Sequence, residues 1–431
     1  MKKLLVLITA LAVACMGTFV YANGIAQSSH FTAKHIAGMN DNTGDETAMY
    51  DPASTVWLKD GIYINVSSFA VIDNIEAKAS GETSKGDVIA WTVPAVSALY
   101  KQGEIAGFLY LNILDGAPFA SIQWDDGTLS TAEENDLLWT TISTYGAGYG
   151  LPASNATTNK VEASSVTYNV TLGGAYKIND MFSVSLAGRY ITSKTKTKLD
   201  GNATAGVAGD YKLTLEYEEE ADGFGGVIGF NVVPAHGWLI GLTYATPVKR
   251  EFKKDVTKTK VTGTNPEVAT GYSKILAGIG DTLDGKKRNY DMPGMVTLTA
   301  AGMPVLGTII ALQVNYMLNK QADWEDAEDD YDNTIVYMLA LTQFLNQQLR
   351  FSLGLMYADK GTKDDYVNPS AVDVNPQSDE IGLGLCGAYS IDENLNVALT
   401  YSYTYYTEIK YEVEKLNKDR HVVGIQVGYK M

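Results

Sequence analysis

One stretch near the end of the chain decides the fold: Leu395-Asn396-Val397-Ala398-Leu399-Thr400-Tyr401-Ser402-Tyr403-Thr404-Tyr405. Large apolar residues alternate here with small or polar ones, and a strand directs such alternating residues to opposite faces. A soluble β-sandwich also has alternating strands, but bulky side chains fill its inward face. Here the face opposite the bulky one carries mainly Ala, Ser and Thr, which suits a wall with lipid outside and space inside. The pattern therefore predicts a strand of a membrane barrel.

The same period of two returns along the whole chain after residue 60. Fourteen runs carry it, at 61–72, 88–100, 104–114, 165–177, 181–197, 211–233, 236–253, 293–303, 307–320, 331–344, 348–360, 379–390, 394–409 and 419–431. No linker or change of composition divides them, so we expect a single domain over residues 59–431. The expected fold class is all-β, a 14-stranded antiparallel transmembrane β-barrel.

The connections between these runs alternate between short and long. Residues 101–103, 177–180 and 391–394 are tight turns, whereas the longest connections are 115–164 and 254–292. Outer-membrane barrels have short periplasmic turns and longer extracellular loops, so we expect these two long loops to be extracellular. An even number of strands then places the N-terminal segment and the C-terminus on the periplasmic side.

Residues 292–318 carry no charge, and an uncharged run of this length also fits a membrane-spanning helix. Gly302, Pro304 and Gly307 interrupt the run and divide it into two segments of strand length. We therefore interpret it as a hairpin about a proline-containing turn.

The first residues have the form of a secretory signal peptide. Lys2 and Lys3 precede an apolar run, and Val20-Tyr21-Ala22 offers a small-residue cleavage site. We expect residues 1–22 to be this signal and the mature chain to be exported. Cys15 leaves a lipoprotein signal as the alternative.

The composition argues against several functional classes. A net charge of −17 lacks the basic footprint of nucleic-acid binding. The four histidines form no cluster with metal-ligand spacing, and there is no nucleophile–base arrangement or phosphate-binding loop. Seven acidic residues between Asp323 and Asp332 lack the glycine and ligand spacing of a calcium loop, so we interpret them as a solvated loop. We expect no enzymatic activity, no cofactor and no metal site.

Several short motifs resemble the FadL family of outer-membrane transporters for long-chain fatty acids and other hydrophobic compounds. Asp51-Pro52-Ala53 precedes the first strand, where the family typically has Asn-Pro-Ala. The other motifs lie at 172–183, 222–249 and in the C-terminal strand, 419–431. The resemblance covers most of the mature chain and implies a fourteen-stranded barrel, in agreement with the runs counted above.

The resemblance also implies a route for a ligand. Residues 23–58 would form a hatch that plugs the barrel from the periplasmic side, and Asp51, Pro52 and Ala53 would belong to it. Substrate would be captured between the long loops, pass to a lumenal pocket near the hatch, and leave sideways through a kinked third strand. Gly107 in that strand would ease a bulge.

Two loops and two arginines supply the candidate ligand contacts. A lipid-like ligand needs an apolar groove with a few polar groups for its head, although apolar loop residues also pack on each other. Arg189 and Arg350 share the parity of the small-residue face of their strands, so either would reach a ligand carboxylate or pair with an interior acid. Lys194, Lys196 and Lys198 would meet lipid phosphates or form a solvated rim. The expected groove residues are Phe119, Trp124, Leu138, Trp139, Ile275 and Leu276.

We therefore predict a protein of the bacterial outer membrane that takes up hydrophobic small molecules passively, with long-chain fatty acids as the principal candidates. Its partners would be that ligand, outer-membrane lipids and lipopolysaccharide, and the outer-membrane assembly machinery. Two alternatives remain at this point: a porin for polar solutes, and a surface adhesin or structural barrel.

Overall fold

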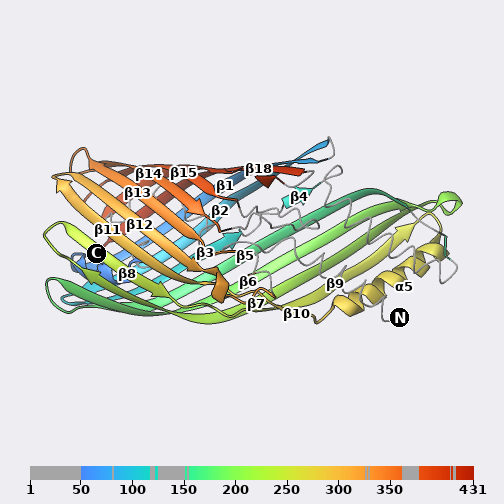
Figure 1. Cartoon of the computed structure of the whole chain (residues 1–431), viewed down its shortest axis with the longest axis horizontal. Helices are drawn as coiled ribbons and strands as arrows, with labels where there is room; N and C mark the ends of the chain where they lie inside the picture. The colour runs from blue at the N-terminus through green and yellow to red at the C-terminus, as the bar shows by residue number, and fades with distance from the viewer. Residues whose placement is uncertain are drawn as a thin grey trace.

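The computed structural model describes residues 50–79, 82–116, 122–124, 151–152, 155–325, 328, 331–361, 378–407, 409–410 and 414–431. The expected signal peptide, residues 23–49 of the expected hatch, and Phe119, Leu138 and Trp139 lie outside these ranges. The described strands form a closed 14-stranded antiparallel barrel, so the predicted fold class is confirmed (Figure 1). The barrel closes because β1 (Gly61–Ala79) pairs with β2 (Glu82–Gln102) on one side and with β18 (Glu414–Lys430) on the other.

The remaining wall strands follow in chain order, each antiparallel to its neighbour. They are β3 (Ile105–Gly116), β5 (Asn155–Lys177), β6 (Phe182–Thr204), β7 (Asp210–Val232), β8 (Trp238–Ala245) with β9 (Glu251–Gly263), β11 (Gly294–Val305), β12 (Thr308–Leu318), β13 (Ile335–Phe344), β14 (Leu349–Asp359), β15 (Glu380–Ser390) and β16 (Leu395–Tyr406). β8 and β9 share one position in the wall, since both pair with β7. Shorter elements are β4 (Ile122–Trp124), β10 (Lys287–Asn289), β17 (Ile409–Lys410), η2 (Gly206–Ala208) and η3 (Asn319–Gln321).

The two faces of the wall differ as the alternation predicts. Leu383 and Leu385 of β15 and Leu399 of β16 are exposed on the outside, whereas Thr400 and Ser402 are buried on the inside. A closed sheet leaves no unpaired edge, and large apolar side chains on its outer face suit contact with lipid.

Tight turns join the strands at one end of the barrel, which we call the short-turn end. The C-terminus lies at this end, because Ile62 N donates a hydrogen bond of 2.9 Å to Met431 O (Figure 1). Gly307 adopts a φ of +83° in the turn between β11 and β12, a conformation that side chains other than glycine rarely adopt. The uncharged run 292–318 therefore contains a hairpin, as expected. Among the residues described, no helix is long and apolar enough to cross a membrane.

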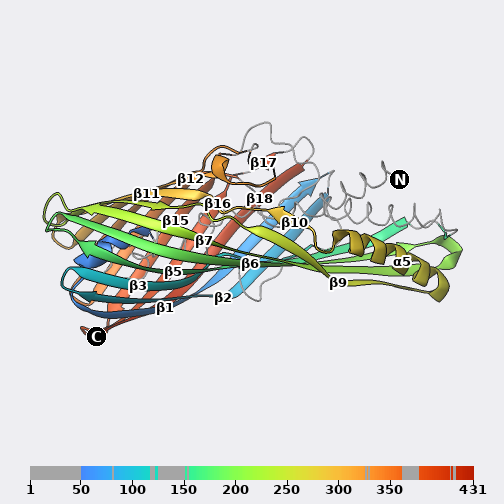
Figure 2. The same cartoon turned by 90° about the horizontal axis from the view of Figure 1, so that it is seen from below.

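At the opposite end, β5, β6, β7 and β9 run well past the rest of the barrel, as Figures 1 and 2 show. We call this projection the finger: residues 155–166, 194–220 and 251–263 together with helix α5 (Pro266–Leu283). The apolar face of α5 packs on β7 and β9, where Leu276 is fully buried. The finger therefore has an apolar core of its own.

The finger corrects the expected loop boundaries. Residues 115–164 and 254–292 were expected to be loops, but β5 begins at Asn155 and β9 continues to Gly263 before α5. The exposed positions of β9 include Lys253, Asp255, Lys258 and Lys260, so the apolar alternation typical of a lipid-facing strand is lost there. The run expected at 236–253 is in turn interrupted between β8 and β9.

Candidate functional site

The described part of the expected hatch is a short 3₁₀-helix, η1 (Pro52–Trp57), which contacts β3, β5, β6, β7 and β8 on the lumenal side. Pro52 begins the helix, at a position where a backbone N–H is not needed. Ser54 N and Oγ both donate to Asp51 O, at 3.0 and 2.8 Å, and Thr55 Oγ1 donates to Pro52 O at 2.7 Å. The turn therefore satisfies several of its own polar groups and is compact.

Three contacts hold η1 against the wall. Ser183 Oγ donates a hydrogen bond of 2.8 Å to Ala53 O. A Cβ added to Gly229 would lie 3.5 Å from Ala53 Cβ, so the glycine permits a close approach. Lys177 Nζ lies 4.9 Å from the centroid of the Trp57 ring, a cation–π contact.

Asp51 directs its carboxyl group into the wall rather than toward water. Thr299 Oγ1 donates to Asp51 Oδ2 over 3.4 Å. A Cβ added to Gly241 would lie 2.9 Å from Asp51 Oδ1 and 2.6 Å from Asn231 Oδ1, so glycine leaves the room for both side chains. Because the carboxyl is buried, its pKa is raised to about 7.

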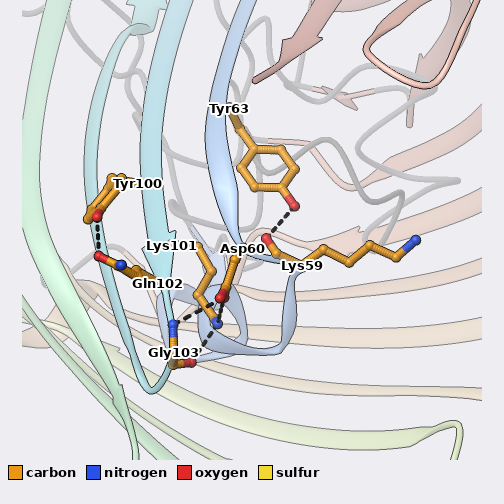
Figure 3. Close-up of polar contacts among 7 residues, drawn as sticks. All are labelled: Lys59, Asp60, Tyr63, Tyr100, Lys101, Gln102 and Gly103. Atoms are coloured by element: carbon orange, nitrogen blue, oxygen red, sulfur yellow. Dashed lines mark hydrogen bonds and ion pairs between the residues drawn. The ribbon is translucent and has the colours of Figure 1, made fainter.

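A clasp at the short-turn end ties the exit of the hatch to the turn between β2 and β3 (Figure 3). Lys101 Nζ donates to Asp60 Oδ1 at 2.8 Å and to Gly103 O at 2.6 Å, and Gly103 N donates to Asp60 Oδ1 at 3.1 Å. Tyr63 OH donates to Lys59 O at 2.6 Å. The chain between η1 and β1 is therefore held at both of its last two residues.

The largest described cluster of buried apolar side chains lines the lumen and includes Tyr50, directly before the hatch turn. Its members come from β1 to β3, β6 to β8 and β11 to β14, and from the segments that connect β8 to β11. They are Tyr50, Tyr63, Leu99, Phe108, Leu114, Ala187, Ile191, Val227, Ala245, Val248, Met292, Met295, Met317, Val336, Met338, Met356 and Ala358. An apolar interior of this extent suits a hydrophobic molecule better than a hydrated ion.

Two buried arginines adjoin this cluster. Arg189 of β6 donates through Nη2 to Thr246 O, and its Nε has no hydrogen-bond partner. Arg250 donates through Nη1 to Ser193 Oγ at 2.9 Å and through Nε to Tyr290 O at 3.0 Å. Arg250 also interacts electrostatically with the carboxyl groups of Asp115 and Asp291, and its backbone N donates to Asp291 Oδ1 at 3.0 Å. Buried charges are costly unless paired, so Arg189, with its unpartnered Nε, is the better suited of the two to an incoming anion.

Comparison with solved structures shows what this arrangement is similar to. A crystal structure of a Pseudomonas aeruginosa FadL homologue has a TM-score of 0.62 at 12% identity, over 96% of this chain and 98% of that one. The Pseudomonas putida toluene transporter TodX has a TM-score of 0.60 at 11% identity, over 92% and 97% of the two chains. The chain has the FadL-type barrel fold.

A third similar structure is the Ralstonia pickettii toluene transporter TbuX, with a TM-score of 0.57 at 12% identity, over 92% of this chain and 97% of that one. No protein-family model and no curated protein matches the sequence. The FadL-type assignment therefore rests on the fold, which the short motifs had indicated.

The third strand of the FadL-type wall has its irregularity at a different place from the one expected. Gly107 pairs in regular register with Tyr100 and Gly174, whereas the register of β3 shifts between Ile113 and Asp115. The expected bulge at Gly107 is therefore a wrong prediction. The pairing of β2 with β3 extends only as far as Val96 and Leu111. Since β2 begins at Glu82, residues 82–95 of β2 have no partner in β3.

The other expected ligand residues are dispersed. Arg350 is the second residue of β14, at the short-turn end, and β14 does not neighbour the β6 strand that carries Arg189. Leu276 is fully buried in the finger and Ile275 is partly buried beside it. The backbone of Trp124 forms part of β4, which pairs with β5. The fold therefore does not gather these residues around one described groove.

Sequence reasoning missed two features of the lumen. Arg250 lies in the interruption between β8 and β9, where strand parity cannot assign a face. The lumenal methionines occupy the same face of β11 to β14 as the small residues of these strands. A large apolar residue at such a position was the signal in the sequence that could have revealed the apolar lumen. Among the described residues, no group of His, Cys, Asp and Glu is arranged to hold a metal ion.

Proposed function

We propose that this protein is a transporter of the bacterial outer membrane for the passive uptake of hydrophobic small molecules, and that long-chain fatty acids are its principal ligands. The observation that carries the proposal is the apolar cluster that lines the lumen next to η1. The outer apolar face supports the location, because an exposed surface of that kind needs lipid around it. Two similar structures are of toluene transporters, which supports a hydrophobic ligand.

In this proposal the amphipathic ligand is held at two ends. Its carboxylate meets Arg189, whose buried Nε lacks a hydrogen-bond partner, and the nearby Arg250. Its chain lies along the apolar cluster, which reaches the arginines through Val248: a Cβ added to Gly225 would lie 2.8 Å from Val248 Cγ2 and 3.0 Å from Arg189 Nε. Head and chain sites are therefore continuous.

Entry and exit complete the proposed route. The ligand is captured at the extracellular end, between the connection from β3 to β5 and the segment that follows β9, passes into the lumen, and is released by a shift of the hatch or of β3. Residues 23–58 act as the hatch, and Asp51, Pro52 and Ala53 form its docking turn on β6 to β8. The incomplete pairing between β2 and β3 supports a sideways exit between these two strands. The C-terminal strand β18 is the segment for the assembly machinery, and the outer wall contacts lipid and lipopolysaccharide.

Binding of a labelled long-chain fatty acid to the purified full-length protein in detergent micelles tests this function. The unmodified protein binds it saturably. Arg189→Gln weakens binding about tenfold or more, because a hydrogen bond to a charged group contributes about 1.5–3 kcal/mol. Arg350→Gln, which alters a guanidinium at the short-turn end, leaves binding unchanged. Absence of saturable binding contradicts the transport proposal, whereas equal effects of the two variants contradict the head-group role alone.

A further inference from the structure

A row of buried polar side chains crosses the lumenal faces of β6, β5 and β3. Thr171 of β5 lies opposite Arg189 of β6, within side-chain contact range. Asn169 Nδ2 donates to Thr171 Oγ1 at 3.1 Å and to Asn112 Oδ1 of β3 at 2.8 Å. Thr171, Asn169 and Asn112 are at most 6% exposed. The row therefore runs from the arginine whose Nε has no hydrogen-bond partner among the described residues to the third strand of the wall.

Asn112 ends this row at the seam between β2 and β3. It is the first residue of β3 beyond the pairing with β2, which stops at Leu111. The next residue, Ile113, belongs to one buried apolar cluster with Ala90 and Val93, and these two lie in the stretch of β2 that has no partner in β3. At this place apolar packing, rather than a backbone ladder between the two strands, joins β2 to β3.

A second polar row occupies the other buried arginine. Arg250 Nη1 donates to Ser193 Oγ at 2.9 Å, and the hydroxyl oxygens of Ser193 and Thr167 are 3.0 Å apart on opposite positions of β6 and β5. Thr167 lies opposite Asp115, because the register of β3 shifts just before this residue. Asp115 interacts electrostatically with Arg250. The wall therefore holds this guanidinium, and a ligand's head group depends chiefly on Arg189 and the first row.

The first row offers what a moving carboxylate needs. A buried carboxylate is costly wherever hydrogen-bond donors are missing. The amide of Asn and the hydroxyl of Thr are donors without a charge, so they can hold a carboxylate and release it again. Asn169 Nδ2 is only 2.8 and 3.1 Å from the polar atoms of its two neighbours, so the two oxygens of a carboxylate can contact one residue before they leave the other.

We propose that Thr171, Asn169 and Asn112 form a relay that passes the ligand's carboxylate from Arg189 to the seam between β2 and β3. The carboxylate replaces the hydrogen bonds within the row one at a time, and the head group leaves the wall beside Ile113. This inference rests on the proposed function, since it assigns residues to the proposed sideways exit.

The relay predicts that binding and passage of a carboxylate respond differently to one variant. N112L/N169L removes both partners of the 2.8 Å hydrogen bond together, which costs less stability than removing one of them. Purified N112L/N169L should bind labelled hexadecanoic acid with a Kd within about twofold of the unmodified value, because Arg189 is intact. Cells that carry the variant in their outer membrane should take up this acid about tenfold or more slowly, because the moving carboxylate loses its hydrogen-bond donors.

Two further variants separate the relay from a structural role of the same residues. T342V/S352A removes another buried cross-strand pair, whose hydroxyl oxygens are 2.8 Å apart on β13 and β14, and should change neither Kd nor uptake. Asn169→Asp preserves the shape of the side chain and adds a negative charge that repels a carboxylate. This variant should slow the uptake of hexadecanoic acid and leave the uptake of hexadecane, which has no carboxylate, as it is in the unmodified protein.

Three results overturn the relay and leave the transport function standing. They are a Kd that weakens in proportion to uptake in N112L/N169L, an uptake rate that this variant leaves unchanged, and an equal loss of uptake for hexadecanoic acid and hexadecane in Asn169→Asp. Absence of saturable binding and of uptake of hexadecanoic acid by the unmodified protein overturns the transport function itself.

Discussion

The two sides of the barrel differ in length. β12 to β15 have 10 or 11 residues each, which is about what a tilted strand needs to cross a bilayer. β5, β6 and β7 have 23 residues each and continue into the finger. The short side is wall alone, whereas the long side is wall and projection in one continuous sheet.

The outward faces change where the short strands stop. On the short side the outward residues are apolar, as at Leu353 and Leu383. On the finger they are charged: Lys194 Nζ lies 2.6 Å from Glu218 and 2.7 Å from Glu220. Outward chemistry therefore follows the surroundings, lipid or water, while the inward face of both parts follows packing. The finger and the wall should accordingly respond to different substitutions.

Leu276→Ala should have the largest effect, and it should be confined to the finger. Truncating a fully buried leucine costs about 2–5 kcal/mol, and this side chain joins α5 to the finger sheet. We expect faster hydrogen exchange and proteolysis over residues 251–283. The barrel itself should stay folded, measured as an unchanged difference in gel mobility between unheated and heated protein. Lys274→Ala, at an exposed position of the same helix, is the control. Loss of the barrel in L276A would show that wall and finger are one cooperative unit.

Asp51→Asn should change how the hatch responds to pH. The raised pKa, about 7 against an ordinary 3.8, means that docking favours the protonated carboxyl. Docking is therefore strongest below about pH 4, weakens by on the order of 4 kcal/mol as pH rises to about 7, and is constant above. The asparagine variant should dock equally at pH 5 and pH 8, measured by protease access to the bonds around η1. The same pH dependence in both proteins would exclude Asp51 as its source.

Leu383→Arg tests the outer face of the short side. A charged residue on the lipid face of a barrel strand costs about 2–4 kcal/mol at the membrane centre and less toward its edges, so we expect about 2 kcal/mol in urea unfolding from liposomes. Thr262→Arg, at an exposed outward position of the finger, should change stability by less than about 0.5 kcal/mol. Equal costs at the two sites would contradict the division into lipid-facing wall and water-facing finger.

Lys194→Ala should have the smallest effect. Its bonds to Glu218 and Glu220 are partly exposed, and exposed ion pairs contribute about 0.2–1 kcal/mol. We expect a reduction of this size at low salt and almost none at high salt, measured as the exchange of finger amides. A salt-independent loss would mean that the lysine stem, rather than its charge, is what stabilises the finger.

The difference between the two sides also explains what the sequence could predict. The run expected at 379–390 is observed as Glu380–Ser390, because lipid on one side and a lumen on the other impose a strict apolar and small alternation. On the finger, water replaces lipid outside the sheet. Lys194, Lys196 and Lys198 were therefore interpreted as a charged rim at the end of their strand, although the strand continues beyond them. Their pairing with cross-strand acids is a tertiary property that no local pattern reports.

The candidate site was predictable where parity held. Arg189 was assigned to the lumenal face by its strand position and is buried there. Strand parity could not assign Arg250 to the lumenal face, because the chain between β8 and β9 forms an isolated bridge from Val248 to Met292 rather than a continuous ladder. Leu276 was assigned to a ligand groove but packs in the finger core, since helix periodicity alone does not tell a core from a groove.

The central claim is that the barrel is plugged and lined for hydrophobic molecules, and ion conductance measured together with fatty-acid binding on one preparation tests it most directly. In planar bilayers the unmodified protein should show little steady conductance and saturable binding, whereas Pro52→Gly, which loosens the turn at the start of η1, should raise the conductance without unfolding the barrel. Large, steady conductance of the unmodified protein with no saturable binding would contradict the account and indicate a porin.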